Sequence, residues 1–306
     1  MPELPEVQTI VDDLNKKIKG GTIVDFWSDW KKAIKSPSYE KFSRDIKNRK
    51  ISGARRIGKN IFIDLSSGKT LYIHLKMTGH LLVKPHSNPL LIKERGQKIS
   101  PSPLQGEGAR RADEVDYFDD KVNQYIHHIW YLNKNKSLEF SDLRKFGKII
   151  LDDTDKINNL PEIKKLGVDA MSEKFTLKKF QEILNKKNRP IGIILMEQEL
   201  VAGIGNIYRS EILFEAGVLP ERKIAGLSPE EIKKIYQNIK KVFKKAIKLR
   251  GTSDSDYRDT SGAPGGFQKV MRVYNKEGAK CQKCGKIIKR SKLGQRSIFY
   301  CANCQK

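Results

Sequence analysis

Four cysteines near the end of the chain place the strongest constraint on how it can fold. They are Cys281, Cys284, Cys301 and Cys304, and their spacing, Cys-x2-Cys-x16-Cys-x2-Cys, uses every cysteine of the sequence. This spacing is typical of a structural zinc site, in which thiolates fill a tetrahedral shell and leave no position open for chemistry. We therefore predict one structural Zn²⁺ ion in a ribbon. Disulfides are the alternative, which a reducing cytosol disfavours.

The charge of the chain indicates the kind of partner it binds. Its 306 residues include 60 Lys and Arg against 36 Asp and Glu, a formal net charge of +24. Such an excess favours a polyanion, with nucleic acid as the first candidate and a merely solvated lysine-rich surface as the alternative. The mean hydropathy is −0.57, and no apolar run approaches the ~18 residues of a membrane-spanning helix. No signal peptide is evident, so we expect a cytoplasmic protein that makes no membrane contact.

The first half of the chain combines one helical pattern with several strand patterns. Apolar residues recur at helical spacing from Val7 to Ile18 and stop at Gly20-Gly21, which predicts a helix with one buried face. Strands are predicted at 22–27, 51–57, 60–65, 70–75, 126–132 and 137–141, with hairpin turns at 66–69 and 133–136. Short strands at this spacing are typical of an antiparallel β-sandwich.

The pattern changes twice further along the chain. Residues 85–116 are rich in Pro, Ser, Gly and charge without a sustained period, and we interpret them as a flexible insertion. From Lys164 the period becomes helical, and Ser228-Pro229-Glu230-Glu231 predicts a capped helix that runs to Gly251. We therefore expect an α+β fold with a β-sandwich domain at 1–155, a helical domain at 164–266 and a zinc ribbon at 267–306.

The start of the chain carries a second chemical signal. Removal of Met1 would free the amine of Pro2, and an α-amino group titrates near ~7.7–8.0, so part of it is a neutral nucleophile in neutral solution. Its adduct with a sugar aldehyde carbon is a charged iminium, and Glu3 adjoins it as a group that can transfer protons. The alternative is that Pro2 only opens a helix, because proline suits the first helical turn.

Three separated motifs together resemble the formamidopyrimidine-DNA glycosylase family, bacterial repair enzymes that remove oxidised purines and cut the resulting abasic site. The motifs are Pro2-Glu3-Leu4-Pro5-Glu6-Val7, the segment VAGIGNIYRSE at 201–211, and the cysteine ribbon with Gln295-Arg296 and Phe299-Tyr300-Cys301. The middle segment is similar to the turn of the family's helix–two-turn–helix motif. The resemblance covers nearly the whole chain except the insertion.

The resemblance implies roles for individual residues. Pro2 would attack C1′ of the damaged nucleotide while Glu3 assists proton transfers, and Lys59 would bind a phosphate near the lesion. Asn206 and Arg296 match further phosphate ligands of the family.

The two glycines before Asn206 can also be interpreted without the family resemblance. Gly203 and Gly205 would let the backbone approach DNA closely, and Asn206 at a helix start can bond an anion. Without the family, this segment indicates only a turn.

A glycosylase must turn its base out of the duplex, which leaves a gap to fill. The family residues that fill this gap match Met77, Arg144 and Phe146. Read alone, Met77 and Phe146 would be assigned to the core. His127 and His128 are candidate contacts to the DNA backbone, with a purely structural role in a strand as the alternative.

The stretch 252–266 matches the family loop that closes over the everted base, and its Ser, Asp and Gly content predicts mobility without DNA. The chain departs from the family pattern at three positions. Lys76 precedes Met77, at a position where the family more often has glycine. Leu143 replaces a proline that is frequent in the family, and Glu199 lies where some members have a cation. These departures leave the choice of lesion open.

The sequence thus predicts a monomeric, nucleoid-associated DNA glycosylase and abasic-site lyase acting on damaged double-stranded DNA. It would remove oxidised purines, such as 8-oxoguanine and formamidopyrimidines, through a Pro2 Schiff base followed by β,δ-elimination. An endonuclease VIII-like enzyme for oxidised pyrimidines is one alternative, which Leu4-Pro5 disfavours. A non-enzymatic DNA-binding zinc protein is the other, and in it the Pro2-Glu3 pair would have no purpose.

Overall fold

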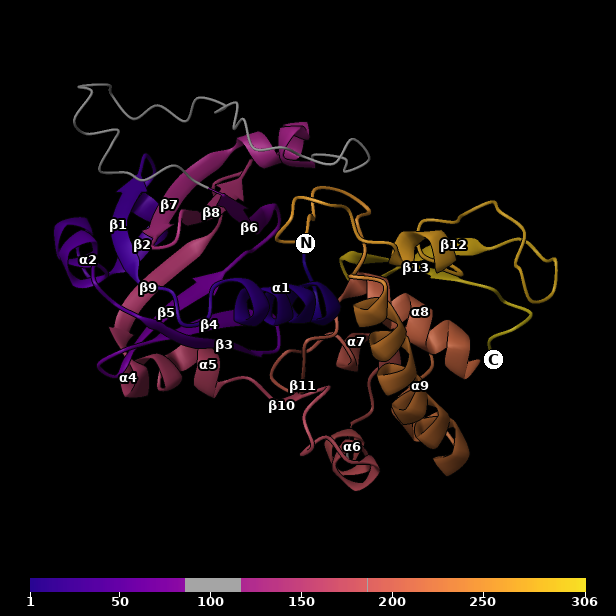
Figure 1. The fold of residues 1–306 in the computed structure, drawn as a ribbon. Helices are drawn as coiled ribbons and strands as arrows, with labels where there is room; N and C mark the ends of the chain where they lie inside the picture. Colours follow the sequence, from indigo (N-terminus) through magenta and orange to yellow (C-terminus); the bar gives the residue numbers. More distant parts are fainter. Residues whose placement is uncertain (86–116, 186) are drawn as a thin grey trace.

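The computed structural model describes residues 1–85, 117–185 and 187–306. The predicted flexible insertion therefore lies outside the described residues, apart from Pro85. Figure 1 shows a lobe of two layered β-sheets beside a helical lobe that carries a small β-hairpin, with α1 (Leu4–Lys17) between them. This arrangement is the α+β fold expected from the sequence.

One sheet of the sandwich has the strand order β1-β7-β8-β6, with every neighbouring pair antiparallel. Its strands are β1 (Ile23–Ser28), β6 (Gly79–Pro85), β7 (Ile126–Leu132) and β8 (Lys136–Asp142). The hairpin of β7 and β8 turns at the predicted place, where Lys134 and Asn135 have φ of 62° and 53°. Strand β6 was not predicted, although it pairs along the whole of β8.

The second sheet has the order β2-β9-β5-β4-β3. Its strands are β2 (Ile34–Ser36), β3 (Ile51–Ile57), β4 (Asn60–Leu65), β5 (Lys69–His74) and β9 (Lys148–Asp153), and α2 (Tyr39–Asp45) follows β2. The sandwich is antiparallel as predicted except at one edge, where β2 runs parallel to β9. A strand of three residues is too short to show a period.

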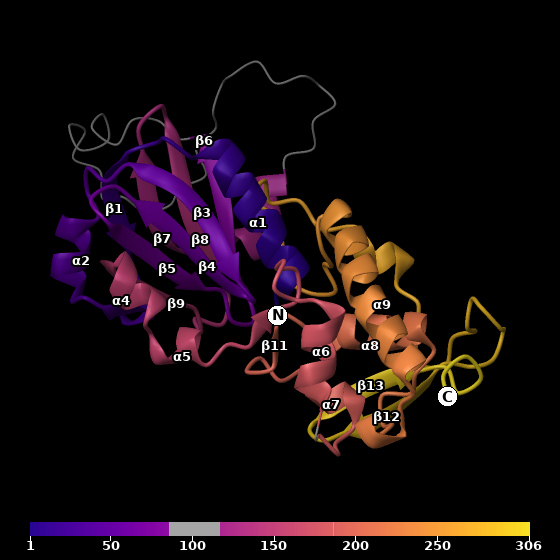
Figure 2. The same ribbon diagram turned by 90° about the horizontal axis from the view of Figure 1, so that it is seen from below.

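Helix α1 contributes to the cores of both lobes (Figure 2). Its predicted apolar face, from Val7 to Ile18, is buried in the core of the sandwich. Leu4, at the first turn, is buried instead in the core of the helical lobe. The start of the chain is thereby held at the junction of the two lobes.

The helical lobe is built around α8 and α9, which pack on each other. The elements after the sandwich are α4 (Thr154–Asn158), α5 (Pro161–Lys164), β10 (Val168–Asp169), α6 (Leu177–Leu184), α7 (Ile191–Ile194), β11 (Val201–Ala202), α8 (Asn206–Ala216) and α9 (Pro229–Lys248). The predicted capping box of α9 is present, since Ser228 Oγ accepts from Glu231 N at 3.2 Å and Glu231 Oε2 accepts from Ser228 N at 2.8 Å. The helix ends at Lys248, just before the predicted Gly251.

The cysteine ribbon ends the chain as a two-stranded antiparallel hairpin. Its strands are β12 (Lys289–Leu293) and β13 (Arg296–Tyr300), and the short 3-10 turns of the structure are η1 (Lys31–Ala33), η2 (Tyr117–Asp119), η3 (Lys121–Gln124), η4 (Ile224–Gly226) and η5 (Phe267–Val270). Across the described ranges, no helix has both the length and the apolar character needed to cross a membrane.

Candidate active site and DNA-contacting residues

The start of the chain is buried against the first turn of α8. Pro2 is buried, whereas Met1 is exposed, and Glu3 is only 3% exposed. The Glu3 carboxylate accepts hydrogen bonds from the backbone N–H groups of Gly205 at 2.7 Å and Ile207 at 3.0 Å. Unpaired N–H groups at a helix N-terminus favour an anion. Helix α8 therefore holds the carboxylate beside Pro2.

Two glycines make this close packing possible. Gly203 has a φ of +110°, and a Cβ added there would lie 2.4 Å from a Leu4 side-chain carbon. A Cβ added to Gly205 would lie 2.3 Å from the Glu3 carboxyl carbon. We expected these glycines to make room for DNA. In the structure, both glycines allow the close approach of side chains at the start of the chain, those of Leu4 and Glu3.

Glu6 is a buried acid that the sequence analysis did not assign to the site. Its Oε2 accepts from the backbone N–H of Glu3 at 2.8 Å, and its Oε1 accepts from the Tyr208 hydroxyl at 2.6 Å and from the Thr252 N–H at 2.7 Å. Burial, and then the nearby Glu3 carboxylate, raise the pKa of Glu6 to about 7. Glu6 thus connects the start of the chain to the loop that begins at Thr252. The capping-box spacing of Glu3 and Glu6 was the one signal that could have identified it.

Lys59 lies in the turn between β3 and β4, where Gly58 has a φ of 57°. The lysine is 8% exposed. Burial lowers its pKa, while the negative charges of Glu3 and Glu6 act in the opposite direction. The predicted catalytic residues therefore share one electrostatic environment at the junction of the lobes.

The two further phosphate ligands predicted from the sequence meet at a shallow depression between α8 and the ribbon. Asn206 and Arg296 both line this depression of about 400 Å³, together with Tyr274. Asn206 Oδ1 accepts from the Arg209 guanidinium, whose Nη2 also donates to the Ser297 carbonyl at 3.0 Å. Arg209 therefore attaches the ribbon to α8 and fixes the relative position of the two ligands.

Met77, Arg144 and Phe146 lie together on the surface. Met77 is 43% exposed and Phe146 is 48% exposed, which excludes the core assignment. The Arg144 guanidinium carbon lies 4.7 Å from the centre of the Phe146 ring, and Arg144 Nη1 lies 3.4 Å from the Met77 sulfur. Two loops that are distant in sequence thus present one exposed cluster, which we call the wedge.

Asp142 organises the wedge and was missed by the sequence analysis. Its side chain is fully buried. Its Oδ2 accepts from the backbone N–H groups of Phe146 at 2.9 Å and Gly147 at 2.8 Å. Its Oδ1 accepts from the Thr78 hydroxyl and from Arg144 N at 3.3 Å. One carboxylate therefore joins both wedge loops, a role that no local pattern reveals.

The two histidines proposed as DNA contacts have different surroundings. His128 is fully buried between the rings of Phe26 and Phe140, and burial lowers its pKa to about 3. A side chain enclosed in this way cannot reach DNA, so its assignment as a DNA contact is wrong and it belongs to the core. His127 is 8% exposed, and its Nδ1 lies 2.8 Å from Asp29 Oδ1. His127 stays a prediction.

The four cysteine sulfurs converge as a zinc site requires. All four lie within 4.8 Å of one another and none forms a disulfide. The sulfurs of Cys284 and Cys301 are 3.5 Å apart, and those of Cys281 and Cys304 are 3.8 Å apart. A tetrahedron with Zn–S bonds of ~2.3 Å has sulfur–sulfur edges of ~3.8 Å. The geometry therefore fits one structural zinc ion, which would join the two turns of the ribbon.

Comparison with protein-family models covers the three parts of the chain in order. Residues 1–149 match the formamidopyrimidine-DNA glycosylase N-terminal domain, 166–257 its H2TH domain, and 278–306 the zinc finger found in FPG and IleRS. The formamidopyrimidine-DNA glycosylase of Pelotomaculum thermopropionicum is 35% identical over 306 residues, covering 100% of this chain and 99% of the relative. That of Carboxydothermus hydrogenoformans is 34% identical, with both chains covered completely.

Solved structures agree with these matches over the whole chain. A complex of Lactococcus lactis Fpg with abasic-site DNA is similar with a TM-score of 0.81 and 28% identity, and both chains are covered completely. The MutM (FPG) protein of Thermus thermophilus is similar with a TM-score of 0.78 and 28% identity over 99% of this chain and 98% of its own. The chain belongs to the formamidopyrimidine-DNA glycosylase family.

Proposed function

We propose that this protein is a DNA glycosylase and abasic-site lyase that removes oxidised purines from double-stranded DNA. The observation that carries the proposal is that the N-terminus of α8 binds the carboxylate of Glu3, the residue directly after Pro2, while the buried Lys59 interacts with the charge of the same carboxylate. A nucleophile and a proton-transfer group are thereby held together at the junction of the two lobes. The names of the curated relatives support the same substrate class.

In the proposed reaction the nitrogen of Pro2, freed by removal of Met1, attacks C1′ of the damaged nucleotide. The N–C1′ bond forms as the glycosidic bond breaks, and the base leaves with a proton. Protonation of O4′, assisted by Glu3, opens the sugar and leaves an iminium between Pro2 and C1′. Loss of a proton from C2′ expels the 3′ phosphate, and a second elimination expels the 5′ phosphate. Water then hydrolyses the adduct and restores the amine.

The remaining residues of the site would bind and distort the DNA. Lys59, Asn206 and Arg296 offer cationic and amide groups to phosphates, and the chain's net charge of +24 favours the same partner. The wedge would fill the space that the everted nucleotide leaves. We further propose that the protein acts as a monomer in the bacterial cytoplasm, at the nucleoid.

Borohydride trapping tests the proposal. The protein should be incubated with a duplex containing 8-oxoguanine, and the Schiff base should then be reduced with borohydride. We expect a covalent DNA adduct on Pro2, the first residue once Met1 has been removed. Pro2→Gly, and a form with a blocked N-terminus, should lose excision and trapping of abasic DNA, and parental rates in either variant would exclude Pro2 as the nucleophile. A protein that binds DNA but neither releases the damaged base nor forms an adduct would be a non-enzymatic zinc protein.

The same assay separates the two substrate branches. One solved structure pairs wild-type Lactococcus lactis Fpg with DNA that contains an oxidised pyrimidine, so both lesion classes should be offered. Preferred trapping on the oxidised purine supports the proposal. Preferred trapping on the oxidised pyrimidine would favour the endonuclease VIII-like alternative.

A further inference from the structure

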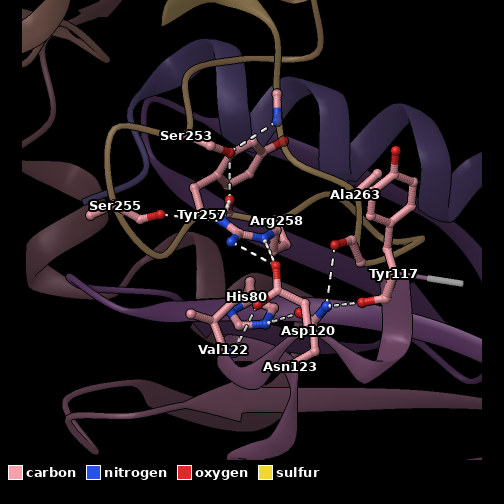
Figure 3. A network of polar contacts seen from close by, with 12 residues as sticks. His80, Tyr117, Asp120, Val122, Asn123, Ser253, Ser255, Tyr257, Arg258 and Ala263 are labelled. Carbon is pink, nitrogen blue, oxygen red and sulfur yellow. Dashed lines mark hydrogen bonds and ion pairs between the residues drawn. The ribbon is translucent and has the colours of Figure 1, made fainter. Parts of the chain in front are cut away.

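The loop at 252–266, which we call the capping loop, is attached both to α1 and to the sandwich. Its first residue is tied to Glu6, and its far end forms a backbone hydrogen bond from Val83 N in β6 to the Thr260 carbonyl at 2.8 Å. Between these points, Asp254 and Ser255 are exposed. The segment made of η2 and η3, residues 117–124, faces the loop from the sandwich (Figure 3).

One contact between the two segments is an ion pair. Arg258 Nε and Nη2 both donate to Asp120 Oδ2, at 2.9 Å and 2.7 Å. The Arg258 side chain is 14% exposed and that of Asp120 is 30% exposed. Arg258 Nη1 also donates to the Ser255 carbonyl at 3.2 Å and to the Tyr257 carbonyl at 2.9 Å. The same guanidinium thus shapes the capping loop and binds it to the sandwich (Figure 3).

The second contact is a chain of neutral hydrogen bonds. Asn123, which is fully buried, donates from Nδ2 to the Tyr117 carbonyl at 2.7 Å and to the Gly262 carbonyl at 3.2 Å. Its Oδ1 lies 2.8 Å from Nε2 of the buried His80 in β6. Because both amide protons of Asn123 are committed to carbonyls, its oxygen must accept, and His80 Nε2 is the donor.

Gly262 lets the capping loop reach this chain. It has a φ of +79°, and a Cβ added there would lie 2.7 Å from Asn123 Nδ2. A side chain at this position would therefore push the loop away from η3. The ion pair, the buried amide and the glycine all act at one interface.

We propose that Asp120 and Asn123 form a latch that holds the capping loop closed before DNA binds, and that Arg258 is a positioning residue for excision. The inference rests on the proposed function, because the loop matters only if a base is turned out beneath it. If the loop is already ordered in the free protein, DNA binding does not have to include the entropy cost of ordering it. Apparent affinity is proportional to the fraction of protein whose loop is closed, so a variant that opens the loop binds more weakly.

The latch predicts different effects on two substrates. An intact lesion has a base for the loop to cover, whereas an abasic site has none. Arg258→Ala and Asp120→Asn should raise the KM for an 8-oxoguanine duplex about tenfold while kcat changes less than twofold. Elimination at a preformed abasic site should stay within twofold of the parental rate. The double variant Asp120→Arg/Arg258→Asp should recover part of the lost affinity.

Arg55→Ala is the matched control, because Arg55 on β3 also pairs with a carboxylate at 2.9 Å, that of Asp64, and lies outside the loop interface. It should leave the KM for both substrates unchanged. Equal losses of the latch variants on both substrates, or none on either, would overturn the proposal.

Hydrogen exchange of the free protein provides a readout that needs no catalysis. Arg258→Ala should accelerate exchange of the amides between 253 and 263, and Arg55→Ala should not. Unchanged exchange in Arg258→Ala would also overturn the latch. If the parental protein forms no adduct with any DNA, the proposed function fails, whereas the exchange result still decides whether the latch exists.

Discussion

The buried carboxylate of Asp142 accepts a hydrogen bond from the backbone N–H of Phe146 at 2.9 Å. Through its other oxygen it also binds Thr78, the residue after Met77. The aromatic and thioether parts of the wedge are therefore positioned by one acid that never reaches the surface. Its removal should affect activity even though it touches no substrate.

Asp142→Ala should destabilise the protein and misplace the wedge. The change leaves several buried donors without an acceptor, and each orphaned donor costs about 1–3 kcal/mol. We expect a lower urea midpoint and at least a tenfold loss of excision from an 8-oxoguanine duplex. Asp152→Ala, at a half-buried carboxylate on β9, is the control. A folded Asp142→Ala protein with parental excision would refute the positioning role.

Phe146→Ala should separate base eversion from chemistry. Unstacking a base costs a few kcal/mol, and a wedge that offsets ~1.4 kcal/mol of this changes the rate about tenfold. Single-turnover excision should therefore fall about tenfold or more on a lesion duplex, with abasic-site cleavage little changed. Leu143→Ala, at a neighbouring side chain that is 46% exposed, is the control. Equal loss on both substrates would assign Phe146 a structural role.

Arg296→Ala should weaken DNA binding without loss of zinc. A phosphate contact contributes about one unit to the slope of log affinity against log salt concentration. We therefore expect a flatter salt dependence by titration, with one equivalent of zinc retained by metal analysis. Cys284→Ser should lose zinc and DNA binding together, because metal binding and folding of such a ribbon are linked. Parental affinity in Cys284→Ser would show that the ribbon does not position Arg296.

Glu6 should make stability depend on pH. Its pKa is raised from 4.5 to about 7 in the folded protein, so the folded state binds more protons than the unfolded state between these values. The free energy of unfolding contributed by this group is therefore highest below pH 4.5 and falls as the pH rises through about 7. The loss amounts to roughly 3 kcal/mol.

Urea unfolding at several pH values checks this dependence. Glu6→Gln should flatten the decline, whereas Glu40→Gln, at an exposed position on α2, should not. An identical pH dependence in the parental protein and Glu6→Gln would contradict the raised pKa.

Lys76→Gly should stabilise the protein. Lys76 has a φ of 55°, a left-handed conformation that costs a residue with a Cβ roughly 1 kcal/mol and that glycine adopts freely. We expect a gain of about 0.5–1 kcal/mol in the free energy of unfolding from urea denaturation. Lys76→Ala removes the same charge but keeps the strain, so it should give no gain. Equal effects of both substitutions would point to charge as the cause.

Local patterns in the sequence predicted the elements whose signals are local. The apolar face from Val7 to Ile18 and the strands at 51–57, 60–65 and 126–132 coincide with observed elements, because periodicity and turn residues lie within each segment. Strand β6 was not predicted from the sequence, because it follows the loop that carries Met77 and ends where the insertion begins. The parallel edge strand β2 was not predicted either, because its partner, β9, is far away in the sequence.

Residue type and spacing predicted the cysteine cluster, whose four sulfurs the structure brings together. The catalytic roles of Pro2 and Glu3 come from the same kind of local signal and stay predictions. Asp142 and Glu6 were not predicted, because their importance comes from which backbone groups reach them after folding. His128 shows the opposite error, since its position in a strand, next to His127, does not reveal that its side chain is enclosed in the core.

The hydrogen bonds between Glu3 and the first turn of α8 tie catalysis to the assembly of the molecule. The carboxylate that would move protons is also one of the contacts that join the start of the chain to the helical lobe. A hinge motion that separated α8 from the sandwich would strip that carboxylate of its donors and disorder the nucleophile beside it. An opened molecule moving along undamaged DNA would therefore be chemically inert, and the ability to cut would return only when the lobes close on a lesion.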